Sequence, residues 1–311
     1  MTKFQFLDNR FRKQYDFNVL YVISYECNYR CPYCFEEYIL KQKKQSELLD
    51  KDIQFFEYLT SLYSDRKNKC ITLYGGEPFF ILKNRILSFI EKFITDWKFV
   101  IVTNLSVTSK RLKEVLKFPS EKIDFIVSLH FHRANLESFT RKLDMVIENG
   151  NDVTLRLMFE KGYRKQILLM INRYYQKYDN LKVLSRKMYD WKHNFSDTYY
   201  TDLEFYKEMS QKYPELNFYV MVDNKKIALR EFIESPLNNF KGWYCDTYYK
   251  SIVLDADGTV YLCETAYMKD TYKLCNIYTD NITCFHRRDT PVVCPLGKCQ
   301  CELFLNKRCR V

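Results

Sequence analysis

Short apolar runs alternate with longer stretches in which apolar residues recur every three or four positions, from about residue 17 to residue 190. Short runs of this kind are typical of buried parallel strands, whereas the longer stretches are typical of helices with one apolar face. We therefore predict strands at 18–24, 70–74, 98–103, 123–129 and 152–158, and a weaker sixth strand at either 181–185 or 216–222.

The intervening segment 46–63 illustrates the helical pattern, because Leu48, Ile53, Phe56, Leu59 and Leu62 fall on one stripe of a helix. The same pattern predicts helices at 83–97, 110–118, 135–149 and 164–178. Five or six consecutive βα units predict an α/β fold that forms a partial or a complete barrel. In such a barrel the chemistry lies at the C-terminal ends of the strands.

The pattern breaks past Trp191, and eight of the twelve cysteines lie between Cys245 and Cys309. Such a density of cysteines predicts a second, metal-bearing module at the C-terminal end. We divide the chain into an N-terminal extension (1–16), a core barrel (17–235) and a cysteine-rich auxiliary module (236–311).

Composition narrows the class of protein. A chain of 311 residues can bury a large hydrophobic core without the help of disulfide bonds or structural metals. The formal net charge of +10 fits an anionic partner such as an acidic peptide, a nucleotide-linked sugar or a nucleic acid, but also a lysine-rich surface encoded by an A+T-rich genome. Neither a helix-turn-helix nor a zinc-finger pattern occurs, so we expect no nucleic-acid partner.

The first ten residues lack the basic start and apolar stretch of a signal peptide. No apolar run approaches the roughly 20 residues that span a bilayer, so we expect no membrane partner. Thiols stay reduced and available to metals in the cytosol, and we therefore predict a cytoplasmic protein.

Cys27, Cys31 and Cys34 lie in a short loop directly after the first predicted strand, where a barrel would place its chemistry. Three cysteines can hold three irons of a [4Fe–4S] cluster and leave the fourth iron open to a small molecule. The alternative, a structural zinc site, needs a fourth nitrogen or sulfur ligand. None of the four histidines lies within 90 residues of this loop.

The second predicted strand is followed by Gly75-Gly76-Glu77-Pro78, in which two glycines allow a close backbone approach. Taken alone, this tetrapeptide is also an ordinary turn. Arg156 lies within the apolar run of the fifth strand, and a buried arginine requires an anionic partner. That partner is either a ligand carboxylate or a helix glutamate.

The cysteine spacing resembles the CxxxCxxC signature of radical S-adenosylmethionine (radical SAM) enzymes, with the aromatic Tyr33 before the third cysteine, and the glycine turn resembles their GGEP motif. This resemblance implies that the amino and carboxylate groups of S-adenosylmethionine chelate the open iron, and that one electron cleaves it to a 5′-deoxyadenosyl radical. It also implies a set of cofactor-binding residues, namely Tyr33, Gly75, Gly76, Glu77, Pro78, Asn104 and Ser128, with Arg156 as a candidate for the cofactor carboxylate. His130 and His132 receive no role.

Cys245 and Cys263 flank a predicted hairpin that turns at Asp257-Gly258. This arrangement is similar to the opening of SPASM and twitch domains, and the later cysteines depart from the full SPASM pattern. The resemblance therefore implies one auxiliary [4Fe–4S] cluster in a twitch-like module, with a zinc site as the open alternative. We assign its ligands as Cys245, Cys263, Cys299 and Cys301, with Cys294 and Cys309 as alternatives.

Three further cysteines have no assigned ligand role. Cys275 stands where related modules often have glycine and is interpreted as a free thiol, and Cys284 is unassigned. Cys70, at the start of the second strand, is interpreted as a small core residue. No catalytic side chain is assigned.

The resemblance implies a partial (β/α)6 TIM-like barrel and an enzyme that abstracts a substrate hydrogen. We expect the modification of a ribosomally made peptide by cross-linking, epimerisation or oxidation, with a reductase such as flavodoxin or ferredoxin as electron donor. Only about 16 residues precede the first strand, so we expect no winged-helix leader-binding domain there. The alternatives are a radical SAM dehydrogenase or epimerase acting on a sugar or nucleotide-linked small molecule, and a non-catalytic iron–sulfur or zinc protein.

Overall fold

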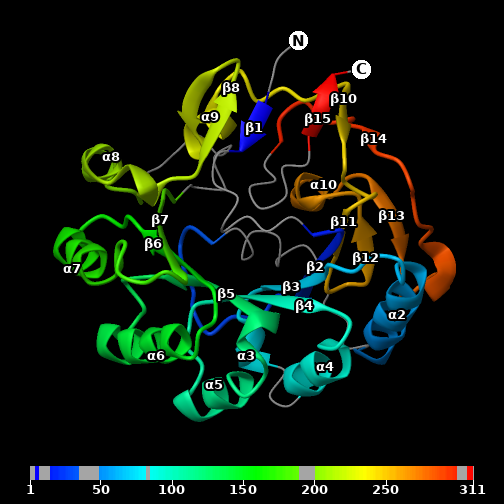
Figure 1. The fold of residues 1–311 in the computed structure, drawn as a ribbon, viewed down its shortest axis with the longest axis horizontal. Coiled ribbons are helices and arrows are strands. Elements are labelled where there is room, and N and C mark those ends of the chain that lie inside the picture. The colour runs from blue at the N-terminus through cyan, green and yellow to red at the C-terminus, as the bar shows by residue number, and fades with distance from the viewer. Residues whose placement is uncertain are drawn as a thin grey trace. The chain divides into compact units, whose positions relative to one another are not determined.

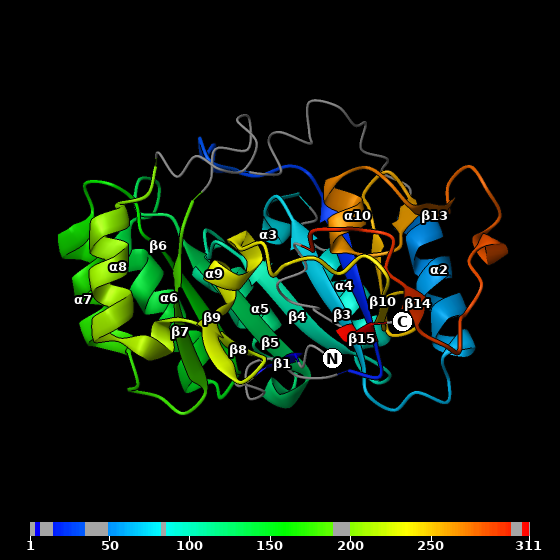
Figure 2. The ribbon, with the colours of Figure 1, turned by 90° about the horizontal axis from the view of Figure 1, so that it is seen from above.

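A computed structural model describes residues 4–6, 15–34, 49–81, 85–188, 200–299 and 307–310. The fold is α/β with a large, mostly parallel sheet. The chain forms two compact units, drawn in Figures 1 and 2. The first unit comprises Met1–Val22, Lys44–Thr72 and Phe218–Val311, and the second comprises Ile23–Lys43 and Leu73–Asn217.

The second unit is built from βα repeats. Its sheet contains the last residues of β2 (Phe17–Ser24) and β3 (Lys69–Gly75), followed in order by β4 (Lys98–Thr103), β5 (Ile123–Leu129), β6 (Val153–Met158) and β7 (Leu181–Arg186). The pairs β4–β5, β5–β6 and β6–β7 are parallel. The helices of this unit are α3 (Pro78–Ile81), α4 (Arg85–Phe93), α5 (Ser109–Val115), α6 (Leu136–Glu148), α7 (Arg164–Tyr174) and α8 (Leu203–Lys212), with the 3-10 turns η1 (Ser120–Lys122) and η2 (Pro214–Leu216).

Helices α4 to α7 cover one face of these strands, as Figure 1 shows. The apolar stripe of α4 is buried, and the ring of its Phe89 meets that of Phe99 in β4 with 6.2 Å between centroids. Burial alternates along β4 and β6, so every second side chain faces the helices. The remaining side chains of these two strands, among them Arg156 and Met158, are only half-buried. These side chains therefore lie on the face of the sheet opposite helices α4 to α7.

The first unit contains strands in the order β13 (Lys273–Asn276), β12 (Thr259–Tyr261), β11 (Ser251–Leu254), and the first residues of β2 and β3. Strands β11 and β12 are antiparallel, which confirms the predicted hairpin, and β11 also pairs in parallel with β2. One three-stranded sheet has the order β1 (Phe4–Phe6), β8 (Tyr219–Val222) and β9 (Lys225–Ala228). Another has the order β14 (Val292–Val293), β10 (Trp243–Cys245) and β15 (Lys307–Arg310). The helices are α2 (Leu49–Leu62), α9 (Leu229–Glu234) and α10 (Glu264–Met268), with the 3-10 turn η3 (Ile282–Cys284).

The five stronger predicted strands are confirmed, and the structure decides between the two candidates for the sixth. Strand β7 at Leu181–Arg186 continues the parallel sheet, whereas β8 at Tyr219–Val222 pairs antiparallel with β1 in a separate sheet. The pairing of Phe4–Phe6 with β8 was not predicted, because residues 1–16 were assigned only to an extension. The partial barrel and the domain boundaries at residues 17 and 236 stay predictions.

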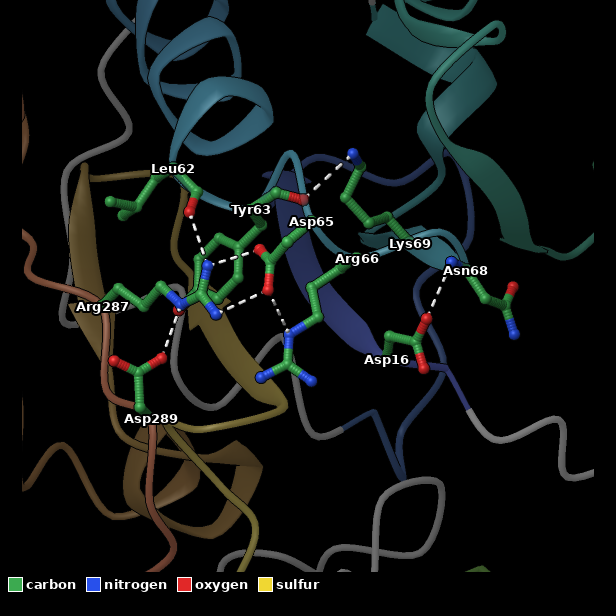
Figure 3. Close-up of polar contacts among 9 residues, drawn as sticks. All are labelled: Asp16, Leu62, Tyr63, Asp65, Arg66, Asn68, Lys69, Arg287 and Asp289. Atoms are coloured by element: carbon green, nitrogen blue, oxygen red, sulfur yellow. Dashed lines mark hydrogen bonds and ion pairs between the residues drawn. The ribbon is translucent and has the colours of Figure 1, made fainter.

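Arg287 anchors the segment after η3 to the end of α2, as Figure 3 shows. Its guanidinium donates hydrogen bonds to the Leu62 carbonyl at 3.0 Å and to the Asp65 carboxylate at 2.8 Å through Nη2, and Nε donates to Asp289 at 2.8 Å. The last carbonyls of a helix lack intrahelical partners, so a cation that binds one satisfies it. This contact fixes residues 285–289 against α2.

A buried carboxylate in the first unit makes the stability of the protein depend on pH. Asp52 is 5% exposed and accepts hydrogen bonds from the hydroxyls of Tyr21 at 2.6 Å and Tyr278 at 2.7 Å. Burial raises the pKa of Asp52 from 3.8 to about 6, although the two hydrogen bonds act in the opposite direction. The folded protein therefore binds a proton between pH 4 and pH 6 that the unfolded chain has already released.

We expect this group to lower the free energy of unfolding by about 3 kcal/mol as the pH rises from 4 to above 6. Chemical denaturation across this range should show a smaller decrease in Asp52→Asn than in the wild-type protein, since the variant has no proton to release. Identical pH profiles for the two proteins would show that Asp52 is not the responsible group.

Candidate functional site

The three-cysteine loop begins three residues after β2 and lies entirely in the second unit. Cys31 is buried, and Cys27 and Cys34 are half-buried. The backbone N–H of Cys34 donates to the Cys31 carbonyl at 3.0 Å, and that of Tyr29 donates to the Cys27 sulfur at 3.3 Å. Burial raises the pKa of both Cys27 and Cys31 as free thiols. A bound metal would supply the positive charge that lowers these pKa values and makes the thiols ligands.

The glycine turn packs directly on the backbone that leads into this loop. Gly76 N–H donates to the Ser24 carbonyl and Glu77 N–H to the Glu26 carbonyl, both at 2.8 Å. A Cβ on Gly75 would lie 2.1 Å from the Ser24 oxygen, and one on Gly76 would lie 2.0 Å from the Glu26 oxygen. Gly75 also adopts φ +130°, which side chains rarely tolerate. The close approach that the sequence predicted is thus an approach to the chain's own backbone.

The Glu77 side chain is 1% exposed and is held by donors from the protein. Oε1 accepts from the Thr103 hydroxyl at 2.7 Å and from Phe79 N–H at 3.4 Å, and Oε2 accepts from Asn104 N–H at 2.7 Å. Burial raises the pKa of Glu77 to about 7 against the lowering effect of these hydrogen bonds. The carboxylate therefore joins the ends of β3 and β4, and its predicted contact with the cofactor amino group stays a prediction.

Asn104 continues this chain of contacts to the cysteine loop. Its Nδ2 lies 3.7 Å from the Cys27 sulfur and 3.3 Å from Asn28 Oδ1, while its Oδ1 accepts from Ser106 N–H at 2.8 Å. Glu77 thus positions Asn104, and Asn104 contacts the first cysteine. The assignment of Asn104 to cofactor binding stays a prediction.

Ser128 and Arg156 are direct neighbours across β5 and β6. In the adjacent pair of strands Thr103 is level with Val127, so Asn104, one residue further along, falls in the same row as Ser128. Both Ser128 and Arg156 are half-buried. Ser128 in β5, Arg156 in β6 and Asn104, directly after β4, therefore lie at one level near the C-terminal ends of these strands.

Tyr33 belongs to a buried polar network that the sequence analysis did not predict. Its hydroxyl donates to Glu160 Oε1 at 2.6 Å and lies 3.0 Å from His130 Nδ1. Glu160 also accepts from the N–H groups of Phe131 and His132 and contacts His132 Nδ1 at 2.8 Å. His130 and Glu160 follow the C-terminal ends of β5 and β6, a position that favours site residues and could have identified both.

His130 connects this network to the cysteine loop, because its Nδ1 lies 3.6 Å from the Cys31 sulfur. Burial, together with the nearby His132, lowers the pKa of His130 to about 4. The His130 ring is therefore neutral at pH 7. Its Nδ1 can donate a hydrogen bond to, or accept one from, Tyr33 or Cys31, depending on the tautomer.

The C-terminal cysteines are brought together in part, all within the first unit. The Cys263 sulfur accepts from Ala266 N–H at 3.4 Å at the start of α10, and the neighbouring Thr265 hydroxyl donates to the Cys299 sulfur at 3.9 Å. Cys245 and Cys294 belong to two adjoining segments, since Cys294 N–H donates to the Trp243 carbonyl at 2.7 Å.

Two of the predicted cysteine ligands cannot be located by their side chains. Cys301 lies outside the described residues, and Cys309 is placed only by the backbone of β15, which pairs with β10. In the part of the chain that the structure describes, no three His, Cys, Asp or Glu side chains are grouped so as to hold a metal ion. The auxiliary cluster and its ligands stay predictions. Within the same ranges, no helix has the length and apolarity that crossing a bilayer requires.

Comparison with known proteins agrees with a cluster-binding fold. A family model described as a 4Fe-4S single cluster domain matches residues 18–144, a range that contains Cys27, Cys31, Cys34 and the glycine turn. A search of curated proteins finds no match.

Several solved structures share the fold. SuiB of Streptococcus suis, bound to S-adenosylmethionine, is 16% identical with a TM-score of 0.54, and the match covers 88% of this chain and 66% of SuiB. The protein anSMEcpe with bound AdoMet is 13% identical with a TM-score of 0.53, covering 86% of this chain and 77% of that one. A form of anSMEcpe with AdoMet and the Kp18Cys peptide is 14% identical with a TM-score of 0.52, covering 86% and 80%. The present chain thus spans about two thirds of SuiB, and at these identities the likeness is one of fold.

Proposed function

We propose that this chain is a radical SAM enzyme whose [4Fe–4S] cluster is held by Cys27, Cys31 and Cys34. The observation that carries the proposal is the continuous set of contacts from Glu77 through Asn104 to the Cys27 sulfur, which joins the two motifs. The match of residues 18–144 to a single-cluster 4Fe-4S domain supports it. So does the fold shared with SuiB and anSMEcpe, whose structures contain S-adenosylmethionine.

The donor chemistry of the three thiols suits such a cluster, because cysteine thiolates are the usual ligands of iron–sulfur clusters. In the described residues these side chains are not grouped in the arrangement of a metal-bound site. When bound and reduced, the cluster supplies the electron that cleaves S-adenosylmethionine to methionine and a 5′-deoxyadenosyl radical, which abstracts a substrate hydrogen. Tyr29 N–H and the Asn104 amide both approach the Cys27 sulfur and would stabilise its negative charge as a thiolate. Arg156 and Ser128 would hold the cofactor carboxylate, because they are paired across β5 and β6 and both side chains are half-buried.

We further propose a peptide as the substrate, modified by cross-linking, epimerisation or oxidation in the cytoplasm. The fold shared with anSMEcpe, one structure of which contains a peptide, supports a peptide substrate. The net charge of +10 favours an acidic peptide over a neutral one. A flavodoxin- or ferredoxin-type reductase would deliver the electron that reduces the first cluster. One auxiliary [4Fe–4S] cluster in a twitch-like module would accept an electron from the substrate radical that hydrogen abstraction leaves.

Anaerobically reconstituted and reduced protein, mixed with S-adenosylmethionine, should form 5′-deoxyadenosine and methionine. Acidic peptides, tested against sequence-matched neutral peptides, should increase the yield. A cross-linked or oxidised product should be lighter by two hydrogens, whereas an epimerised product should keep its mass and incorporate one deuterium in D₂O. If a nucleotide-linked sugar, and no peptide, increases the yield of 5′-deoxyadenosine and is itself modified, the peptide proposal is contradicted while the enzyme assignment stands. Failure to form 5′-deoxyadenosine with a fully loaded cluster would contradict the enzyme assignment itself.

A further inference from the structure

His130 lies between a buried polar network and the second cysteine of the loop, and the proposed function assigns it no role. Its Nδ1 lies 3.0 Å from the Tyr33 hydroxyl oxygen and 3.6 Å from the Cys31 sulfur. The rings of Tyr33 and His130 are stacked, with 5.8 Å between their centroids. All three residues belong to the second unit. The effect of His130 on the sulfur depends on whether Nδ1 carries a proton.

Glu160 fixes the direction of the hydrogen bond that Tyr33 makes. Its side chain is 5% exposed, and each carboxylate oxygen already accepts a backbone N–H, Oε1 from Phe131 at 3.0 Å and Oε2 from His132 at 3.2 Å. Because both oxygens are acceptors, the 2.6 Å contact with Tyr33 is a hydrogen bond that the hydroxyl donates to Oε1. A tyrosine hydroxyl has a single proton, so Tyr33 can only accept from His130.

This network assigns the proton of a neutral His130 ring to Nδ1, because an unprotonated nitrogen would set its lone pair against those of the hydroxyl oxygen. A doubly protonated ring also carries a proton at Nδ1, so the assignment does not depend on the charge of the ring. One N–H can be shared between two acceptors, and the Cys31 sulfur is the second acceptor within reach. His130 therefore offers a hydrogen-bond donor to Cys31.

The cysteine loop is also held beside His130 by other contacts. Arg133, in the segment that follows β5, donates from Nη2 to the Arg30 carbonyl at 3.2 Å. The residue before Cys31 is thereby bound to the same segment that carries His130. Cys31 itself is buried in one apolar cluster with Met188, which lies beyond the end of β7. The donor and the sulfur are thus kept in contact by a hydrogen bond to the backbone and by packing.

We propose that His130 is a hydrogen-bond donor to Cys31 that raises the reduction potential of the first [4Fe–4S] cluster, with Tyr33 and Glu160 as its positioning residues. This inference rests on the proposed function, in which Cys31 holds that cluster. Reduction adds one electron from the flavodoxin- or ferredoxin-type donor, and it makes or breaks no bond and takes no proton from His130. Hydrogen bonds to the cysteine sulfurs stabilise the added negative charge. Tyr33 weakens the effect, because its oxygen competes for the same proton.

The test measures the midpoint potential of the first cluster in the full-length, iron-loaded protein without S-adenosylmethionine, by redox titration followed by electron paramagnetic resonance. The signal of the first cluster is the one that disappears when alanine replaces Cys27, Cys31 and Cys34. His130→Leu removes the donor, so at the wild-type midpoint the ratio of reduced to oxidised cluster should fall about tenfold, a shift of about 59 mV for one electron. Tyr33→Phe removes the competing acceptor, so the same ratio should rise.

Two further variants and a second spectroscopic readout separate this role from a merely structural one. His130→Asn is the conservative variant, because its amide nitrogen can take the place of Nδ1 as donor, and it should keep the ratio close to the wild-type value. The matched control for Tyr33→Phe is Tyr163→Phe, which removes the hydroxyl of a ring stacked on Phe131 and should leave the potential unchanged. Pulsed resonance spectra of reduced protein labelled with ¹⁵N-histidine should show a nitrogen coupling that is lost in His130→Leu.

A wild-type potential in His130→Leu would overturn the proposal, as would shifts of His130→Leu and Tyr33→Phe in the same direction. If His130→Leu binds no cluster, the Tyr33→Phe variant and the labelled wild-type protein decide, and the proposal fails if the ratio does not rise or the nitrogen coupling is absent. Absence of a signal that depends on the three cysteines would contradict the proposed function itself. Opposite shifts in a protein that forms no 5′-deoxyadenosine would support the role of His130 and contradict only the enzyme assignment.

Discussion

Replacement of Cys27, Cys31 and Cys34 together by alanine is expected to abolish the formation of 5′-deoxyadenosine and to remove about half of the iron. Two [4Fe–4S] clusters correspond to roughly eight irons per chain, and each holds four. The loss should be confined to the first cluster, because these three cysteines lie in the second unit and the predicted auxiliary ligands lie in the first. Iron quantification and chromatographic assay of 5′-deoxyadenosine on the same preparation measure both effects.

Cys70→Ala is the matched control, since it removes a cysteine that lies in β3 with no exposed surface. It should keep the full iron content and activity. Full iron content in the triple variant would instead show that another set of residues holds the first cluster.

Gly76→Ala is expected to disrupt the same cluster without changing any ligand. The new Cβ would lie 2.0 Å from the Glu26 oxygen and 2.8 Å from the Tyr25 oxygen, and both are backbone atoms that cannot move aside as a flexible side chain would. The backbone just before Cys27 must therefore shift. Overpacking of this kind typically costs about 1–3 kcal/mol, so we expect a lower thermal midpoint together with loss of iron from the first cluster.

The matched control is Gly297→Ala, where the nearest atom to the new Cβ is Asn239 Oδ1 at 3.9 Å. Thermal unfolding and iron content of this variant should equal those of the wild-type protein. Wild-type values for Gly76→Ala as well would mean that the turn does not support the cysteine loop.

The strands of the parallel sheet could be predicted because each is a short apolar run bounded by polar residues. The same signal could not distinguish β7 from β8, since Tyr219–Val222 is also an apolar run and its antiparallel partner Phe4–Phe6 lies more than 200 residues away. Pairing between distant short strands leaves no periodic trace in the sequence. For the same reason, the parallel pairing of β11 with β2 was not anticipated.

At the candidate site, the motifs identified the loops but not the internal contacts of their side chains. The predicted contact of Glu77 with a ligand stays a prediction. The sequence did not predict that Thr103 and Asn104 donate to its carboxylate, although a buried charge requires nearby donors. Glu160 was missed because Glu160-Lys161-Gly162 has the composition of an exposed turn.

The electron paramagnetic resonance spectrum of the reduced, reconstituted protein, recorded before and after addition of S-adenosylmethionine, tests most directly whether the first cluster has an open iron. We predict that the ligand changes the spectrum of the wild-type protein, because it binds to that iron, and that the triple alanine variant shows no such change. A wild-type spectrum that is unaltered by saturating S-adenosylmethionine, with no 5′-deoxyadenosine formed, would contradict the proposed enzyme.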